Sequence, residues 1–287
     1  MPVRSSVVTA PGSPLAHRLA VLDPGAVVHV PWPGADVDAT RDLLARHDGA
    51  TSLVYVSSAT VYGAWADNPV PLTEDAPLRP NPIVGDAIRH AEAERLVAQW
   101  ADDHPRARVT VLRPASMLGP GVDSWLAHTP RLRSTRADPA RQFVHVDDVA
   151  AAVHLALREG LDGVFNVAAD GSIASEVVRG LSAGRVSIPV PDVVARWTSA
   201  LGLSGVPSEL GPLAEHPWVV ANDRLRAAGW APQYTNEEAI VAGRPGSWWR
   251  EMSPGRRQQV TLGASVALIG GAVAGAAAVV VARRRVS

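Results

Sequence analysis

The sequence predicts an α/β fold: a doubly wound parallel sheet, a small C-terminal lobe and one C-terminal transmembrane helix. Three observations predict it. Short apolar runs of the kind found in buried parallel strands recur along the first 168 residues. Segments of helical periodicity separate these runs. An uncharged apolar run at residues 260–282 then stands apart from the rest of the chain.

Apolar runs bounded by glycine, proline and charged residues define the predicted strands. The clearest is SLVYVSS at residues 52–58, which is almost continuously apolar. Pro31, Pro33 and Gly34 end the run AVVHVPW, because proline lacks a backbone donor and glycine favours turns. In chain order, the predicted strands are 7–9, 26–32, 52–58, 108–112, 142–144 and 163–168.

Segments with helical periodicity lie between the strands. Leu43 and Leu44 form the apolar side of one, and Asp147 and Asp148 stand in the first turn of another, where acidic residues suit the helix dipole. Residues 64–82 are rich in proline and polar residues, so we expect a long loop there. The predicted helices are 15–22, 36–47, 84–103 and 146–158.

The pattern weakens from about residue 172, where prolines break the chain into short elements. We expect this part to be a small lobe that completes one wall of a cleft. The predicted organisation is a sheet domain at 1–171, a lobe at 172–249, a linker at 250–259 and a transmembrane helix at 260–282.

Residues 260–282 have the length and the flanks of a membrane span. As a helix they would be about 34 Å long, against roughly 30 Å of bilayer hydrocarbon. Arginines precede the run at 256 and 257 and follow it at 283–285, which favours a span over a buried apolar helix of a soluble core. The N-terminus shows no signal-peptide pattern. We therefore expect a single-pass protein of the cell membrane with its domain facing the cytoplasm.

Composition excludes several kinds of site. The chain has no cysteine, which rules out disulfides, iron–sulfur clusters and thiolate zinc sites. Its nine histidines lack metal-ligand spacing, so we expect no metal. A net charge of -1 gives no reason to expect nucleic acid as a partner. Every basic residue is arginine, so a mechanism that requires lysine is closed to this protein.

Four stretches carry a resemblance to a known family. They are LVYVSSATVYG at 53–63, PLTEDAPLRPNP at 71–82, VLRPASMLGPG at 111–121, and FVHVDDVA at 143–150 with FNVA at 165–168. In this order they resemble the extended short-chain dehydrogenase/reductases, also called NAD-dependent epimerase/dehydratases. The resemblance implies a Rossmann-like sheet and NAD or NADP as the cofactor. It also implies that the helices at 36–47 and 84–103 pair with a second copy or with an active relative.

The family's catalytic pair is missing. The resemblance places a Tyr-x-x-x-Lys pair on the helix at 84–103, where this chain has Asp86 and His90. An unperturbed aspartate, with a pKa of about 3.9, is a poor proton donor to an alkoxide near neutral pH. A histidine supplies no permanent cation. Ser58 matches the family's catalytic serine, which alone can only hydrogen-bond a substrate oxygen.

The implied cofactor site is also eroded. The family's glycine-rich loop aligns with residues 9–16, where its three glycine positions hold Ala10, Ser13 and Ala16. Pro14 removes a backbone donor. The strands that carry the adenosine half of the site are missing, because only a few residues separate Leu22 from the next strand. The residues left to line a cofactor pocket are Thr9, Gly12, Ser13, Ser57, Pro114 and Ser116.

Three hypotheses follow. In the first, the protein is a membrane-tethered, non-catalytic relative that binds a partner, a nucleotide or a nucleotide sugar. In the second, a replaced set of Ser58, Asp86 and His90 runs epimerase, dehydratase, oxidoreductase or hydrolytic chemistry. In the third, cofactor binding survives as a sensor without turnover. Burial discriminates between the second hypothesis and a solvated surface pair, since a working Asp86–His90 pair must face the cleft beside Ser58.

Overall fold

The structure is a computed structural model, and it describes residues 7–10, 12–19, 25–122, 124, 127, 132–134, 139–181, 188–191, 193, 194, 197 and 207–243. All of these belong to one compact unit, Met1–Arg244. The predicted linker at 250–259 and the predicted span at 260–282 lie outside the described residues. Within the described part of the chain, no helix is long and apolar enough to cross a membrane.

A five-stranded parallel sheet forms the centre of this unit, in the order β1-β2-β3-β4-β8. Its middle strands are buried on both faces, as continuous apolar runs require. The predicted α/β fold with a Rossmann-like parallel sheet is therefore confirmed. The strands are β1 (Val7–Val8), β2 (Ala26–His29), β3 (Ser52–Val56), β4 (Arg108–Pro114) and β8 (Gly163–Val167).

Strand β1 lies at one edge of this sheet. Val7 and Val8 pair with Val27 and Val28 of β2, and on the other side of β1 the described residues place no further strand. Each later strand lies on the same side of the one before it, so the strand order never reverses. In the described sheet, all the other strands therefore lie on one side of β1.

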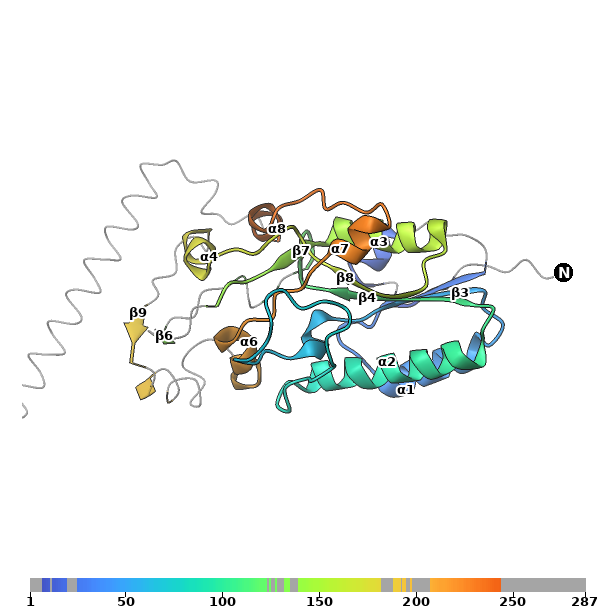
Figure 1. Cartoon of the computed structure of the whole chain (residues 1–287), viewed down its shortest axis with the longest axis horizontal. Coiled ribbons are helices and arrows are strands. Elements are labelled where there is room, and N and C mark those ends of the chain that lie inside the picture. The colour runs from blue at the N-terminus through green and yellow to red at the C-terminus, as the bar shows by residue number, and fades with distance from the viewer. Residues whose placement is uncertain are drawn as a thin grey trace, which may run out of the picture. The chain divides into compact units, whose positions relative to one another are not determined.

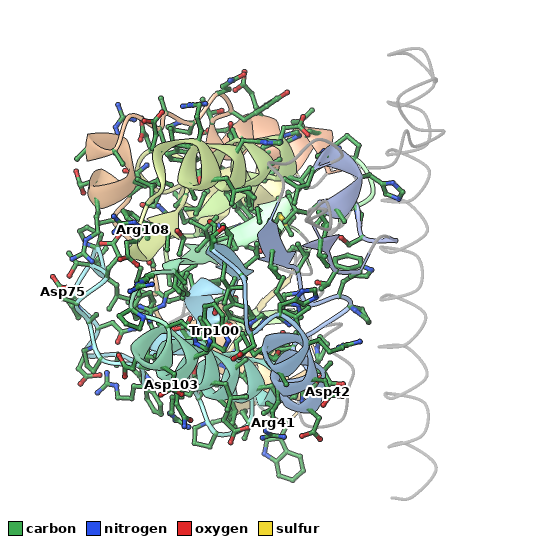
Figure 2. All side chains as sticks on the ribbon, turned by 90° about the vertical axis from the view of Figure 1, so that its right-hand side faces the viewer. Arg41, Asp42, Asp75, Trp100, Asp103 and Arg108 are labelled. Carbon is green, nitrogen blue, oxygen red and sulfur yellow. The ribbon has the colours of Figure 1, made fainter. Side chains whose placement is uncertain are left out.

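Helices cover both faces of the sheet (Figure 1). Helices α1 (Val37–Arg46) and α2 (Gly85–Asp103) pack together on one face, where Asp36 caps α1 by accepting from two backbone amides. Helix α3 (Val146–Glu159) and the short α7 (Asp223–Ala227) lie on the other face. Arg41 and Asp42 of α1, and Trp100 and Asp103 of α2, mark the first face in Figure 2.

The predicted helix at 15–22 is wrong in its described part. Residues 16–18 form a single 3-10 turn, η1 (Ala16–Arg18), and the backbone leaves helical geometry at Leu19. This one short turn already buries the side chains of Leu15 and Leu19, which are each 1% exposed. Residues 20–24 lie outside the described part of the chain.

Smaller elements complete the unit. Strand β5 (Ser116–Leu118) pairs with β7 (Phe143–His145), and β6 (Leu132–Ser134) pairs with β9 (Ile188–Val190). The remaining elements are η2 (Ala59–Tyr62), α4 (Ser175–Leu181), η4 (Ser208–Leu210), α6 (Gly211–Glu215) and α8 (Asn236–Ala242).

Asp148 ties the C-terminal part of this unit to α3. Its carboxylate, which is 1% exposed, accepts from the backbone amides of Gln233 and Tyr234. Burial raises the pKa of this carboxyl above its ordinary value. His145 caps α3 and stacks on Tyr234, with 3.8 Å between ring centroids. The motif FVHVDDVA is therefore a structural element of this fold.

Candidate functional site

A cleft of about 270 Å³ opens at the carboxyl edge of β2, β3 and β4. Ligands of open α/β sheets bind at this edge, because the loops that follow the strands meet there. Segments after the three strands, the start of α2 and the region of α6 form its walls. Of the residues predicted from sequence, six line it: Ser57, Ser58, Asp86, His90, Pro114 and Ser116.

Ser58 is the N-cap residue of η2. It caps this turn, because its Oγ accepts from the backbone amide of Thr60 at 3.2 Å and from the Thr60 hydroxyl at 2.9 Å. The hydroxyl hydrogen of Ser58 itself stays available to a ligand in the cleft. Ser116 lies across from it after β4 and shares a 2.6 Å hydrogen bond with Ser124.

Asp86 and His90 reach the same cleft from one face of α2. His90 is 6% exposed, whereas the side chain of Asp86 is 46% exposed, so the histidine is buried and the carboxylate is open to solvent. Nδ1 of His90 lies 3.0 Å from the hydroxyl of Tyr55, which is fully buried beneath α2. Nε2 of His90 lies 3.6 Å from Oδ2 of Asp86, which is longer than a hydrogen bond. Burial lowers the pKa of His90, so its ring is neutral at pH 7.

The other oxygen of Asp86 holds the loop after β2. Oδ1 accepts from the amide of Ala35 at 2.9 Å and from the Arg89 guanidinium at 3.2 Å. Gly34 allows the carboxylate of Asp86 to come this close to the loop, because a Cβ on residue 34 would lie 2.8 Å from Oδ1. Oδ1 of Asp86 is therefore held by the loop after β2 and by Arg89, while Oδ2 has no hydrogen bond among the described residues.

The structure brings Ser58, Asp86 and His90 to one cleft but does not link them as a nucleophilic set. A hydrolytic triad needs a histidine between the carboxylate and the serine. Here the two ring nitrogens of His90 face Tyr55 and Asp86, and the described residues show no hydrogen bond between His90 and Ser58. Among the described residues, Ser58 Oγ is hydrogen-bonded to the amide and the hydroxyl of Thr60 and has no general base as its partner.

A buried ion pair that the sequence pattern did not predict joins α2 to β4. Arg113 of β4 binds Glu94 of α2 through two nitrogens, at 2.6 Å and 3.1 Å, and both side chains are 6% exposed. Ser57 donates to Glu94 at 2.5 Å, and Arg113 donates to Tyr62 at 2.8 Å. The available signal was a glutamate four residues after His90, on the buried face of the same helix.

Thr9, Gly12 and Ser13 do not line this cleft. Thr9 Oγ1 lies 2.8 Å from Nδ1 of His29 and accepts from the amide of Val30, so it joins β1 to β2. Ser13 is buried, and its Oγ accepts from the amide of Ala16 at 3.0 Å. Gly12 is exposed, with open space around its Cα. These three residues build the turn after β1.

This turn differs from a phosphate-binding loop in the backbone amides that it can offer and in the residues that pack against it. The amide of Ser13 already donates to the carbonyl of Ala10 at 2.8 Å, Pro14 has no amide hydrogen, and only the 3-10 turn η1 follows. In addition, Gly121 packs against the Pro14 ring, because a Cβ on Gly121 would come within 3.3 Å of Pro14 Cγ. The loop that follows β5 thus contacts this turn.

The described residues therefore do not fit a whole nicotinamide dinucleotide. A dinucleotide spans the point where the strand order of a doubly wound sheet reverses, and the described sheet has no such point. What remains is the cleft on the side of β2 to β4. Among the described residues, no group of three or more histidines and carboxylates is placed to hold a metal ion.

Comparison with known proteins agrees with this architecture. Residues 35–168 match the model of the NAD dependent epimerase/dehydratase family. The chain is 30% identical to the protein Rv0501 of Mycobacterium tuberculosis over 198 residues, which are 66% of this chain and 52% of that protein. It is 32% identical to the GDP-6-deoxy-D-mannose reductase of Pseudomonas aeruginosa over 164 residues, 52% of each chain. The chain thus spans about half the length of the curated relatives it matches.

Solved structures share the fold. The structure of RMD from Pseudomonas aeruginosa, complexed with NADPH, is similar with a TM-score of 0.57 and 19% sequence identity. The similarity covers 83% of this chain and 97% of that one. A dTDP-glucose 4,6-dehydratase from Bacillus anthracis, in complex with NAD, gives a TM-score of 0.57 over 76% of this chain and 70% of that one, at 19% identity.

Proposed function

Because residues 35–168 of this chain match the model of the NAD dependent epimerase/dehydratase family, we propose that the protein binds a nucleotide sugar, or the sugar part of one, in the cleft at the carboxyl edge of its sheet. We propose further that it does so without hydride transfer to or from a dinucleotide. The relatives whose names state an activity act on nucleotide sugars, such as the GDP-6-deoxy-D-mannose reductase.

One observation carries the proposal: β1 is an edge strand of the described sheet, while the cleft beside β2 to β4 is intact. Losing the strands beyond β1 removes the surface for the adenosine half of a cofactor. It leaves the opposite half, where hydroxyls and apolar side chains surround a cavity of about 270 Å³. That volume is close to the lower end of small-molecule sites, about 300 Å³.

The chemistry of Asp86 and His90 supports the absence of hydride transfer. Reduction of a carbonyl needs a proton donor for the developing alkoxide. Oδ1 of Asp86 already accepts hydrogen bonds from Ala35 and Arg89, and His90 has no permanent charge to hold a cofactor ribose. With no lysine in the chain, no other residue replaces that cation in kind.

A binding experiment with a blocked cleft tests this function. UDP-glucose, GDP-mannose and the free hexoses are titrated into the full chain in detergent micelles by isothermal calorimetry. Ser116→Phe places a ring in the cleft and abolishes the binding that the proposal requires, whereas Ser172→Phe, at an exposed position outside it, leaves binding unchanged. Equal binding by both variants contradicts the proposed site.

We also propose that residues 260–282 hold the protein in the cell membrane with its domain on the cytoplasmic side. The length of this run and the arginines on both of its flanks support this proposal. A ligand-binding domain without turnover would then report on, or retain, its ligand at the membrane surface.

A further inference from the structure

The cleft holds a donor and an acceptor that do not satisfy each other. Oδ2 of Asp86 and Nε2 of His90 are 3.6 Å apart, and both residues line the cleft. His90 is 6% exposed, the side chain of Asp86 is 46% exposed, and neither Nε2 of His90 nor Oδ2 of Asp86 has a hydrogen bond among the described residues. The two atoms thus present an unfilled hydrogen-bonding position at the cleft wall.

Tyr55 fixes which of these atoms donates. Among the described residues, the one partner of the buried Tyr55 hydroxyl is Nδ1 of His90, at 3.0 Å. The hydroxyl hydrogen must point at this nitrogen, because a buried donor without an acceptor costs about 1–3 kcal/mol. We therefore assign the tautomer of His90 in which Nδ1 accepts and Nε2 carries the hydrogen. The cleft then displays an N–H donor beside a carboxylate acceptor.

A hydroxyl group is the ligand group that matches this pair. Its oxygen can accept from Nε2–H and its hydrogen can point at Oδ2, with each heavy-atom distance about 2.8 Å. A phosphate or carboxylate can accept from Nε2–H but has no hydrogen to give, and it is repelled by Asp86. An amine can approach Asp86 but only meets another donor at His90.

The rest of the cleft has the same preference. Ser58, Thr60 and Ser116 add hydroxyls that both donate and accept, and Trp32, 42% exposed, offers a flat apolar face. No arginine is among the described residues that line the cleft, and the chain has no lysine. Among the described residues that line the cleft, a nucleoside diphosphate would find no cation to balance its charge.

We propose that this cleft recognises an uncharged, hydroxyl-rich ring, a free sugar or cyclic polyol, and that one ligand hydroxyl bridges Nε2 of His90 and Oδ2 of Asp86. The inference rests on the proposed function and narrows it: the ligand is the sugar without its phosphate. Asp86 and His90, which stand where the resemblance places the family's catalytic tyrosine and lysine, would then bind the ligand without taking part in catalysis.

The test compares neutral and phosphorylated forms of the same sugars. Glucose, galactose and mannose, and their 1-phosphates, are titrated into the full chain and followed by saturation-transfer NMR and calorimetry. We expect at least one hexose to bind, and its 1-phosphate to bind at least tenfold more weakly. Asp86→Asn removes the ionised acceptor and weakens the hexose at least tenfold, whereas Asp103→Asn, at the far end of α2, leaves it unchanged (Figure 2).

A second variant, Trp32→Ala, tests the cleft even if the Asp86 variant fails to fold. Its matched control is Trp197→Ala, at another exposed tryptophan. Loss of hexose binding in Trp32→Ala alone supports the cleft as the sugar site. Equal or tighter binding of the 1-phosphates, no binding of any hexose, or an unchanged affinity in Asp86→Asn overturns the inference. Each of these results leaves the absence of dinucleotide turnover untouched, since that claim is tested with the dinucleotides.

Discussion

Ala10 adopts a backbone conformation that suits glycine. Its φ is 49°, in the left-handed region, where the Cβ of an L-residue costs about 1–2 kcal/mol. The carbonyl of Ala10 accepts from the amide of Ser13, so the conformation is part of the turn after β1. Ala10 thus occupies a backbone position that glycine would adopt without strain.

Ala10→Gly should therefore stabilise the protein. We expect the free energy of unfolding to rise by about 0.5–1 kcal/mol, since relief of the left-handed strain exceeds the added entropy of the unfolded chain. Ala98→Gly, at an exposed position within α2, should instead lower it by about 1 kcal/mol. Urea denaturation of the full chain measures both, and a loss of stability in Ala10→Gly would show that no strain is stored there.

His29 makes stability depend on pH. Burial, followed by the proximity of His90, lowers the pKa of His29 from 6.5 to about 4. The unfolded chain therefore takes up a proton first as the pH falls below 6.5, and stability is lost between pH 6.5 and about 4. The slope approaches about 1.4 kcal/mol per pH unit in the middle of that window.

Comparing denaturation at pH 7.5 and pH 5 tests this dependence. We expect His29→Gln to lose less stability between the two pH values than the native chain does, whatever its stability at pH 7.5. The exposed His17→Gln should keep the native dependence. An unchanged dependence in His29→Gln would mean that this histidine is not held neutral in the folded state.

At the scale of the elements, the ion pair of Glu94 and Arg113 joins α2 to β4 under the cleft. Removing one partner leaves a buried charge without compensation, which costs about 3–5 kcal/mol. Replacing both by apolar residues removes the desolvation penalty as well. We expect Glu94→Met to be more destabilised than the double variant Glu94→Met/Arg113→Met. Additive losses in the two single variants and the double variant would show that the pair is not coupled.

Strands and long helices were largely predictable because their periodicity is local. Strands β2, β3, β4 and β8 and helices α1, α2 and α3 begin and end within a few residues of the predicted positions. Proline and glycine defined several of these ends. Strands β5 and β6, three residues each, were missed, because a strand of that length has too few positions to show a pattern and depends on its partner.

The candidate site was only partly predictable. The resemblance located Ser58, Asp86 and His90, which line one cleft, because aligned motifs carry the position of a residue in the fold. Tyr55 and Glu94 were not found, since their roles depend on hydrogen bonds across three elements that no local pattern encodes. Thr9, Gly12 and Ser13 were predicted at a cofactor pocket, and the structure places them in the turn after β1, outside the cleft.

At the scale of the whole molecule, the proposed membrane anchor makes a prediction that is independent of the cleft. The full chain should sediment with membranes and resist extraction at alkaline pH, because residues 260–282 match the bilayer in length. Replacing Ala267 and Gly271 by arginine should release it, since charges in the hydrocarbon are costly. A chain that leaves the membrane without this change would contradict the anchor.

We propose that the described sheet lacks the half that binds the adenosine of a dinucleotide and keeps the half that binds a sugar. Calorimetric titration of NAD, NADH, NADP and NADPH into the full chain tests it most directly. The account predicts no binding tighter than millimolar for any of the four, in a preparation that binds a sugar ligand. Binding of any one of them in the micromolar range, with or without turnover, would contradict it.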